Sequence, residues 1–211
     1  MEVTFWGHSC FLVSSGDDRV LVDPGTFTPR LPSLSPQAVV VTHVHPDHFD
    51  REVLTRLITE DSSRRIFSTA AVAETLGPTV TVVDADCCDT VGSLRFEFTT
   101  GAHAEILEKA PRPENLAVRI NDELFYPGDS FSPPGGDVNL LMLPISAPWL
   151  RISEVEKYLQ LVRPKWVVPV HTGVLSDDGL KLTLGLVRSI TRDIRAEFTE
   201  LLPGERCTVD V

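Results

Sequence analysis

The sequence lacks the long apolar runs and the paired cysteines that are typical of membrane and secreted proteins. No apolar stretch approaches the roughly 18 residues needed to cross a bilayer, and Met1 is not followed by the basic and apolar segments that direct export. Cys10, Cys87, Cys88 and Cys207 show no CxxC spacing, which predicts reduced thiols rather than a zinc knuckle or a disulfide framework. We therefore expect a cytoplasmic protein without a membrane span.

Basic charge is also scarce. The chain has 19 Lys and Arg against 30 Asp and Glu, a formal net charge of −11 at pH 7, and such a surface repels a phosphate backbone. Its 211 residues, 42% of them hydrophobic, contain neither an internal repeat nor a low-complexity tract. We expect one domain over residues 1–211 and a small-molecule substrate, with no nucleic-acid partner. Assembly into a homo-oligomer stays open.

Short segments rich in Val, Leu and Phe, separated by Gly and Pro turns, predict a protein rich in β-strands. The expected strands are Glu2–Trp6, Cys10–Ser15, Arg19–Asp23, Ala38–Thr42, Arg64–Ser68, Thr79–Asp84, Ser93–Thr100, Asn115–Ile120, Glu123–Tyr126, Val138–Leu143, Trp166–Val170 and Cys207–Val211. The expected helices are Asp50–Glu60, Ala70–Leu76, a segment from the capping box Ser153-x-x-Glu156 to Pro164, and Leu180–Ile190. An initial antiparallel meander, followed by strands alternating with helices, favours an α/β protein with two packed sheets covered by helices.

Three histidines and an aspartate lie within six residues, directly after the expected strand Ala38–Thr42. His43 and His45 are two residues apart and can face one point, whereas Asp47 and His48 follow the turn at Pro46 and can face another. One loop could therefore serve two metal ions. A solvated histidine-rich loop is the alternative at this stage.

Three further candidate ligands each stand at the end of an expected strand. His103 follows the strand that ends near Gly101, Asp129 follows Gly128, and His171 follows Val170. Taken singly, each would more often be an ordinary core or surface residue. Together with the histidine loop, they predict a metal site to which five of the six histidines contribute.

The order of these residues resembles the metallo-β-lactamase superfamily, in which HxHxDH is followed by a distant His, a bridging Asp in a Gly-Asp-[Ser/Thr] turn, and a last His. The resemblance covers nearly the whole chain and implies a four-layer αββα sandwich. It also implies two metals: the first held by His43, His45 and His103, the second by Asp47, His48 and His171, and both bridged by Asp129.

Two other segments extend the resemblance. Asp23, in Val20–Pro24, is similar to an early Asp of the superfamily that orients metal ligands, although a turn-forming Asp before Pro explains it equally well. Trp6-Gly7-His8-Ser9 and Leu143-Pro144-Ile145 resemble the branch that contains ascorbate-6-phosphate lactonase. That branch would place His8 beside the site as a substrate ligand or proton donor; a structural His at a strand end is the alternative.

The resemblance implies a metal-dependent hydrolase. Mixed imidazole and carboxylate ligands suit zinc, and they also admit manganese or iron. A hydroxide held between two such ions would attack a small ester, a lactone or a phosphodiester. Asp47 would take or relay the proton, or would serve as a ligand only.

Residues near the expected site suggest how a substrate is held. Ala104–Glu114, with Lys109 and Arg112, is expected to form a mobile loop beside His103, while Trp149 and Arg151 follow another strand. These side chains would contact an anionic substrate, unless the charged ones are only solvated surface groups.

Two rival functions stay open at this stage. A nuclease or phosphodiesterase of the tRNA 3′-processing type would use the same chemistry, but the acidic net charge disfavours it. A non-catalytic metal-binding or sensor protein is disfavoured by the complete ligand set.

Overall fold

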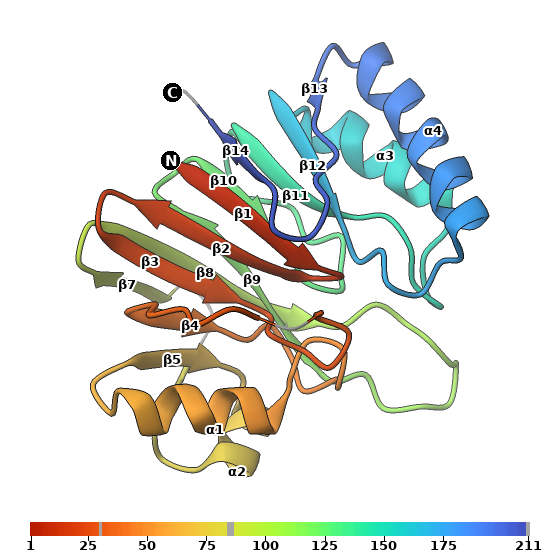
Figure 1. The fold of residues 1–211 in the computed structure, drawn as a ribbon. Coiled ribbons are helices and arrows are strands. Elements are labelled where there is room, and N and C mark those ends of the chain that lie inside the picture. Colours follow the sequence, from red (N-terminus) through yellow and green to blue (C-terminus); the bar gives the residue numbers. More distant parts are fainter. Residues whose placement is uncertain (30, 84–86, 210–211) are drawn as a thin grey trace.

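The computed structural model describes residues 1–29, 31–83 and 87–209. Two mixed sheets, each with seven strands, pack against each other (Figure 1). The first sheet contains, in spatial order, β14 (Arg206–Thr208), β1 (Glu2–Gly7), β2 (Cys10–Ser15), β3 (Asp18–Val22), β4 (Ala38–Val40), β5 (Arg65–Ser68) and β6 (Val80–Val82). The second contains β13 (Glu197–Phe198), β12 (Trp166–Val170), β11 (Leu140–Pro144), β10 (Leu124–Tyr126), β9 (Glu114–Ile120), β8 (Leu94–Ala102) and β7 (Cys87–Val91).

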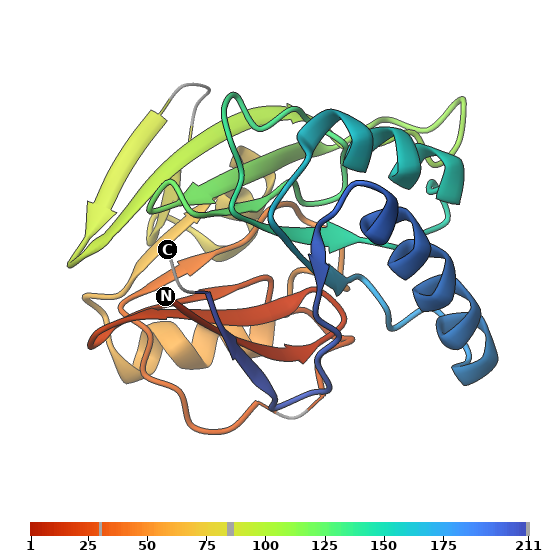
Figure 2. The same cartoon turned by 90° about the horizontal axis from the view of Figure 1, so that it is seen from above.

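Helices cover the outer face of each sheet, so that the molecule has four layers (Figures 1 and 2). The helices are α1 (Arg51–Glu60), α2 (Ala70–Leu76), α3 (Ile152–Val162) and α4 (Asp177–Asp193). Leu54 of α1 and Val72 of α2 pack with Val39 and other residues of the first sheet. Val155 of α3 and Val187 of α4 pack on the second sheet. The four-layer αββα architecture expected from the sequence is confirmed.

The central core lies between the two sheets. It joins alternate residues of the first sheet, such as Val13 and Val20, to Phe96, Val118 and Tyr126 of the second. All five side chains are completely buried. Because successive residues of a strand point to opposite faces, each sheet contributes one set of side chains to this core and another to the layer under its helices. The apolar runs in the sequence follow from this double burial.

Several element boundaries differ from the sequence prediction. The proposed capping box at Ser153 is wrong: α3 begins at Ile152, and the backbone N–H of Arg151 donates to the carboxylate of Glu154 at 3.1 Å. Helix α4 begins earlier than expected, because Ser176 caps it by accepting from the N–H of Gly179. The charged residues of its first turn carry no apolar periodicity, so the sequence pattern did not mark this start.

Two strands of the second sheet were not expected. Strand β7 pairs with β8 at the sheet edge, and its side chains alternate between partly buried and exposed, which leaves no apolar run to recognise. Strand β13 has only two residues beside β12. The end of the expected strand at Asp84 lies outside the described residues. The expected strand near the C-terminus is β14, which closes the edge beside β1, and residues 210–211 are likewise outside the description.

Within the described ranges, no helix has the length and apolar character required to span a membrane.

Candidate metal centre

The candidate ligands gather where several strands end at the same edge of the two sheets. Strands β3 and β4 run parallel, and Asp23 and the loop beginning at His43 follow their carboxyl ends. Strands β10, β11 and β12 are also parallel, so that Asp129 and His171, which follow β10 and β12, come to one side. Carboxyl ends of parallel strands are the usual place for a site in such sheets. Oδ1 of Asp129, which follows a strand of the second sheet, lies 3.2 Å from Nε2 of His48, which follows a strand of the first.

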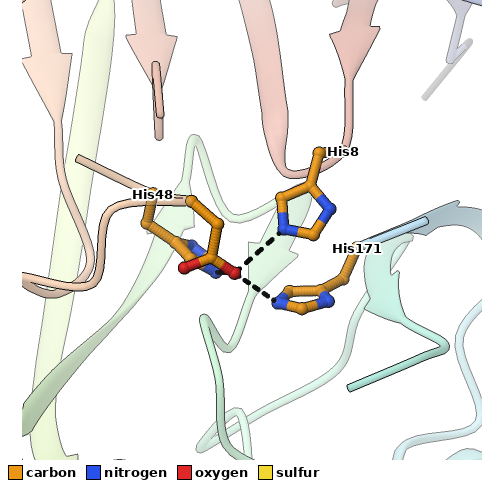
Figure 3. Close-up of side chains that lie close together, drawn as sticks. His8, His48 and His171 are labelled. Carbon is orange, nitrogen blue, oxygen red and sulfur yellow. Dashed lines mark hydrogen bonds and ion pairs between the residues drawn. The ribbon is translucent and has the colours of Figure 1, made fainter. Parts of the chain in front are cut away.

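All seven predicted ligands lie together, and His8 joins them. The potential ligand atoms form three overlapping groups, each spanning no more than 4.8 Å: His43 with His45 and His103; His43 with His48 and Asp129; and His8 with Asp47, His48 and His171. All six histidines of the chain therefore belong to a single cluster of neighbouring side chains. Figure 3 shows the rings of His8, His48 and His171 close together. Oδ2 of Asp47 lies 3.2 Å from Nε2 of His8 and 3.4 Å from Nε2 of His171.

The inward-facing atoms of this cluster fit a cation better than they fit one another. Four of them are buried without a hydrogen-bond partner among the described residues: His48 Nε2, His103 Nε2, His171 Nε2 and Asp129 Oδ1. Buried polar atoms are seldom left unpaired in native proteins, and such groups need an explanation. Several imidazole nitrogens around a carboxylate are a donor set that suits a divalent transition metal.

The outer nitrogens of the rings determine which inner nitrogen is free. Nδ1 of His103 lies 2.6 Å from the carbonyl of Ala104, Nδ1 of His171 contacts the carbonyl of Ser146, and Nδ1 of His48 lies 2.7 Å from Oδ2 of Asp23. Each of these partners is an acceptor, so the proton of the neutral ring sits on Nδ1. The lone pair of Nε2 then points into the cluster.

Hydrogen bonds also determine which nitrogen of His43 carries the proton. The hydroxyl of Thr42 donates to Asp23 at 2.8 Å, so it accepts from Nδ1 of His43, 3.0 Å away. This leaves Nε2 of His43 as an acceptor facing Nδ1 of His45 at 3.1 Å. The pKa of His43 lies well below its ordinary value, first because the ring is buried and next because His48 is close. A neutral ring is the form that binds a metal.

Asp23 was predicted either to orient ligands or to form a turn, and the structure shows that it contacts the candidate ligand His48. Its completely buried carboxylate accepts from the N–H and hydroxyl of Thr42, from the hydroxyl of Tyr126 at 2.9 Å and from Nδ1 of His48. It also turns the chain after β3, with a φ of 45°. Asp23 therefore forms the turn and also contacts a candidate ligand; its role in orienting a metal ligand stays a prediction.

Asp129 carries negative charge deep in the cluster. Burial alone would raise the pKa of this carboxyl, but the imidazoles around it, that of His48 foremost, hold the pKa well below its ordinary value. Oδ1 lies 3.2 Å from Nε2 of His48, and Oδ2 lies 3.4 Å from Nε2 of His103 and 3.2 Å from Nε2 of His171. One carboxylate therefore faces ligand atoms from more than one group.

Asn115, at the start of β9, is a site residue that the sequence reasoning missed. Its buried amide accepts from the N–H of Asp129 at 2.9 Å and donates to the carbonyl of Pro127 at 2.8 Å. The turn between them contains Gly128 at a φ of 62°, where an added Cβ would lie 2.4 Å from the Asn115 oxygen. Because Asn115 stood in an ordinary strand pattern, only its contact with a turn 14 residues away reveals its role.

We expect Asn115→Ala to destabilise the metal-free protein by about 2 kcal/mol, because it leaves the N–H of Asp129 and the carbonyl of Pro127 buried without partners. Urea unfolding followed by circular dichroism measures the change. Asn139→Ala is the control, since the side chain of Asn139 makes no hydrogen bond within the described residues. Equal stability of the two variants would contradict this role for Asn115.

A cavity of about 540 Å³ opens beside the cluster. Its lining includes Ala104 and Ser130, which are the neighbours of His103 and Asp129 in the chain. Trp149 forms another wall, and its indole N–H donates to Oδ2 of Asp129 at 2.9 Å. Arg112 and Arg151 also line the cavity, whereas Lys109 is not among its lining residues.

Similar proteins were found by sequence and by structure. The family model described as "Beta-lactamase superfamily domain" matches residues 2–171. Protein Rv0786c of Mycobacterium tuberculosis is 32% identical over 197 residues, which cover 90% of this chain and 93% of that protein. A UPF0173 metal-dependent hydrolase of Methanosarcina barkeri is 26% identical over 200 residues, which cover 81% of this chain and 83% of the relative.

Two solved structures extend the comparison to the fold. Igni18, a metallo hydrolase of Ignicoccus hospitalis, has a TM-score of 0.76 at 19% identity and covers 100% of this chain and 98% of its own. The metallo-β-lactamase fold protein YhfI of Bacillus subtilis has a TM-score of 0.71 at 19% identity and covers 98% of each chain. At such low identity, these likenesses bear on the fold alone.

Proposed function

Because this chain belongs to the metallo-β-lactamase superfamily and is a metal-dependent hydrolase of that superfamily, we propose that it cleaves a small ester, lactone or phosphodiester at a site for two divalent cations. One observation carries the proposal. Three buried Nε2 atoms and one carboxylate oxygen point into the cluster without partners. Relatives with UPF0173 names are called metal-dependent hydrolases, which supports the reaction class.

We propose the following assignment of ligands. One cation is held by His43, His45 and His103, and the other by Asp47, His48 and His171. Asp129 serves both, and its position between His48 on one side and His103 and His171 on the other supports that role. Zinc is the proposed metal, with manganese and iron as the alternatives that metal analysis would reveal.

The residues of this chain would divide the work of hydrolysis between them. When bound, divalent cations at this site would polarise the substrate and lower the pKa of water toward neutrality. The side chain of Asp47 is 21% exposed, whereas that of Asp129 is 4% exposed. Of the two carboxylates, that of Asp47 is therefore the more accessible to solvent. It is therefore suited to receive a proton as well as to bind a cation.

The substrate would occupy the cavity between Arg112, Trp149 and Arg151. Neither guanidinium takes part in an ion pair found within the described residues. Nε of Arg112 donates to the carbonyl of His103 at 2.8 Å, and its remaining N–H groups would meet an anionic group of the substrate together with Arg151, in a lining that also contains Glu105 and Glu154. Phe131 meets Trp149 edge to face, with ring centroids 5.4 Å apart, and offers an apolar surface beside them. A small substrate that carries an anionic group fits these walls.

We further propose the lactonase-like branch and a cytoplasmic location. Gly7 and Pro144, from the two segments that resemble this branch, end β1 and β11 at the edge that holds the site. All four cysteines are free thiols, as is usual in a reducing compartment.

The decisive experiment measures metal content and hydrolysis in the same preparation. We expect about two divalent cations per chain, turnover of one member of a panel of lactones, esters and phosphodiesters, loss of turnover on chelation, and recovery when metal is returned. Salt-sensitive cleavage of RNA would favour the nuclease instead. A fully loaded protein that hydrolyses no member of the panel would favour a metal-binding or sensor role.

Arg151→Gln tests the anionic subsite. We expect this change to raise KM for an anionic substrate by about tenfold, because a charge-assisted hydrogen bond is lost, and to leave KM for a neutral analogue unchanged. Steady-state kinetics on the matched pair of substrates provides the readout. Arg192→Gln is the control, since that exposed side chain contacts Ser189 of its own helix. Equal effects on both substrates would contradict the subsite.

A further inference from the structure

His8 lies in the turn between β1 and β2, and it is the sixth histidine of the metal cluster. Its side chain is completely buried, and its ring centroid lies 4.1 Å from that of His171 and 5.2 Å from that of Phe27. Nε2 of His8 lies 3.2 Å from Oδ2 of Asp47, and Figure 3 shows the ring of His8 beside those of His48 and His171. Position alone would therefore make His8 a candidate ligand equal to His48 and His171.

The hydrogen bonds of His8 have the opposite polarity from those of the other two rings. The backbone N–H of Gly173 lies 3.0 Å from Nδ1 of His8, and an N–H can only donate, so Nδ1 is the acceptor. The proton of the neutral ring is then on Nε2, which lies 3.2 Å from Oδ2 of Asp47.

His48 and His171 instead place their protons on Nδ1, through Asp23 and the carbonyl of Ser146. Their Nε2 atoms lie 3.7 Å and 3.4 Å from the same oxygen of Asp47. In the neutral rings these two lone pairs face an anionic oxygen and repel it, so a cation, or a proton on each ring, must lie between these atoms. His8 supplies an N–H to that oxygen, and this attraction holds the carboxylate beside the two rings.

A second contact ties His8 to the loop after β12. The N–H of His171 donates to the carbonyl of His8 at 2.7 Å. Both residues have a left-handed backbone, with φ of 51° for His8 and 60° for His171, a conformation that costs energy for residues other than glycine. An added Cβ on Gly173 would come within 3.0 Å of the His8 ring, so this loop and ring are closely fitted.

From these contacts, and resting on the proposed two-cation function, we propose that His8 is a positioning residue and not a metal ligand: its Nε2–H orients Asp47 toward the second cation, and its carbonyl fixes His171. His8 belongs to the group of Asp47, His48 and His171, and not to the group of His43, His45 and His103 that would hold the first cation. Loss of the His8 ring should therefore weaken one site and spare the other.

Stepwise zinc affinities of the full chain test the proposal. We expect His8→Phe, which keeps a ring but has no N–H, to weaken the second zinc by about 10- to 100-fold and to leave the first unchanged. His8→Gln, which retains an N–H donor near Nε2, should recover most of the loss. Phe27→Leu is the matched control for ring packing, since it removes the aromatic contact with His8 and no hydrogen bond. Equal second-site affinity in the wild type and His8→Phe would overturn the proposal.

Nitrogen NMR of the histidine rings gives a readout that needs no variant. We expect His8 to carry its proton on Nε2 in both the metal-free and the zinc-loaded protein, while His48 and His171 show metal-bound Nε2 after loading. A metal-bound nitrogen in His8 would overturn the proposal. A wild-type chain that binds fewer than two zinc ions would instead refute the proposed function itself, so the two failures are distinguishable.

Discussion

Replacing Asp129 with alanine is expected to reduce the bound cations from about two per chain to at most one and to lower the rate of hydrolysis by at least about 100-fold. The reason lies in the two oxygens of this carboxylate. Oδ1 faces His48, and Oδ2 faces His103 and His171, all within 3.4 Å. Removing the side chain therefore takes a ligand from both groups at once and leaves a ring of imidazoles without the negative charge that helps to retain cations.

Metal analysis after dialysis measures the first effect, and turnover of the best substrate of the panel measures the second. Asp137→Ala is the matched control, because Asp137 is an exposed carboxylate on the loop before β11. Asp129→Asn separates charge from shape, since the amide keeps one oxygen in place. An Asp129→Ala protein that retains two cations and full turnover would disprove the shared-ligand role.

Asp23→Asn should produce the largest loss of stability, about 3 to 5 kcal/mol in the metal-free protein. The carboxylate of Asp23 accepts four hydrogen bonds in a fully buried position, from two donors of Thr42, from Tyr126 and from His48. An amide of the same shape turns an N–H₂ group toward some of these donors. Asn tolerates a positive φ, so the effect should report on the lost hydrogen bonds and not on the backbone at φ 45°.

Urea unfolding of the metal-free chains gives the free-energy difference. Asp17→Asn is the control, because Asp17 is an exposed carboxylate in the turn before β3. We also expect Asp23→Asn to weaken zinc binding, since Nδ1 of His48 loses the acceptor that directs its Nε2 inward. A stability change below about 1 kcal/mol would contradict the role assigned to Asp23.

The sequence identified the residues that gather in the cluster because their chemistry is rare and their positions are local; that they bind metal stays a prediction. His43, His45, Asp47 and His48 occur within six residues, and each remaining candidate follows a recognisable strand. Asn115 carried no such signal. An Asn at the start of a strand is ordinary, and its value comes from a contact with the turn at Gly128 that depends on how β9 and β10 pair.

The helices and strands were likewise predicted correctly where a local sequence pattern marked them. Strands with continuous apolar runs were placed well, because burial on two faces leaves a strong pattern in the sequence. The start of α3 was misplaced by the Ser153 motif, since Arg151 and Ser153, two residues apart, each have a Glu three positions later and only the observed contact between Arg151 and Glu154 distinguishes them. The edge strand β7 was missed because one side of it is exposed to solvent.

The sequence by itself determined the αββα class and the set of imidazoles and carboxylates, because apolar periodicity and ligand chemistry are properties of the residues themselves. Tertiary structure alone decided the hydrogen-bond partners of each ring within that set. His8 and His171 are chemically identical side chains whose rings lie 4.1 Å apart. Gly173 donates to Nδ1 of one, and the carbonyl of Ser146 accepts from Nδ1 of the other, so their inward nitrogens differ in polarity. Which backbone group meets a ring depends on how distant loops pack, and no local pattern in the chain encodes it.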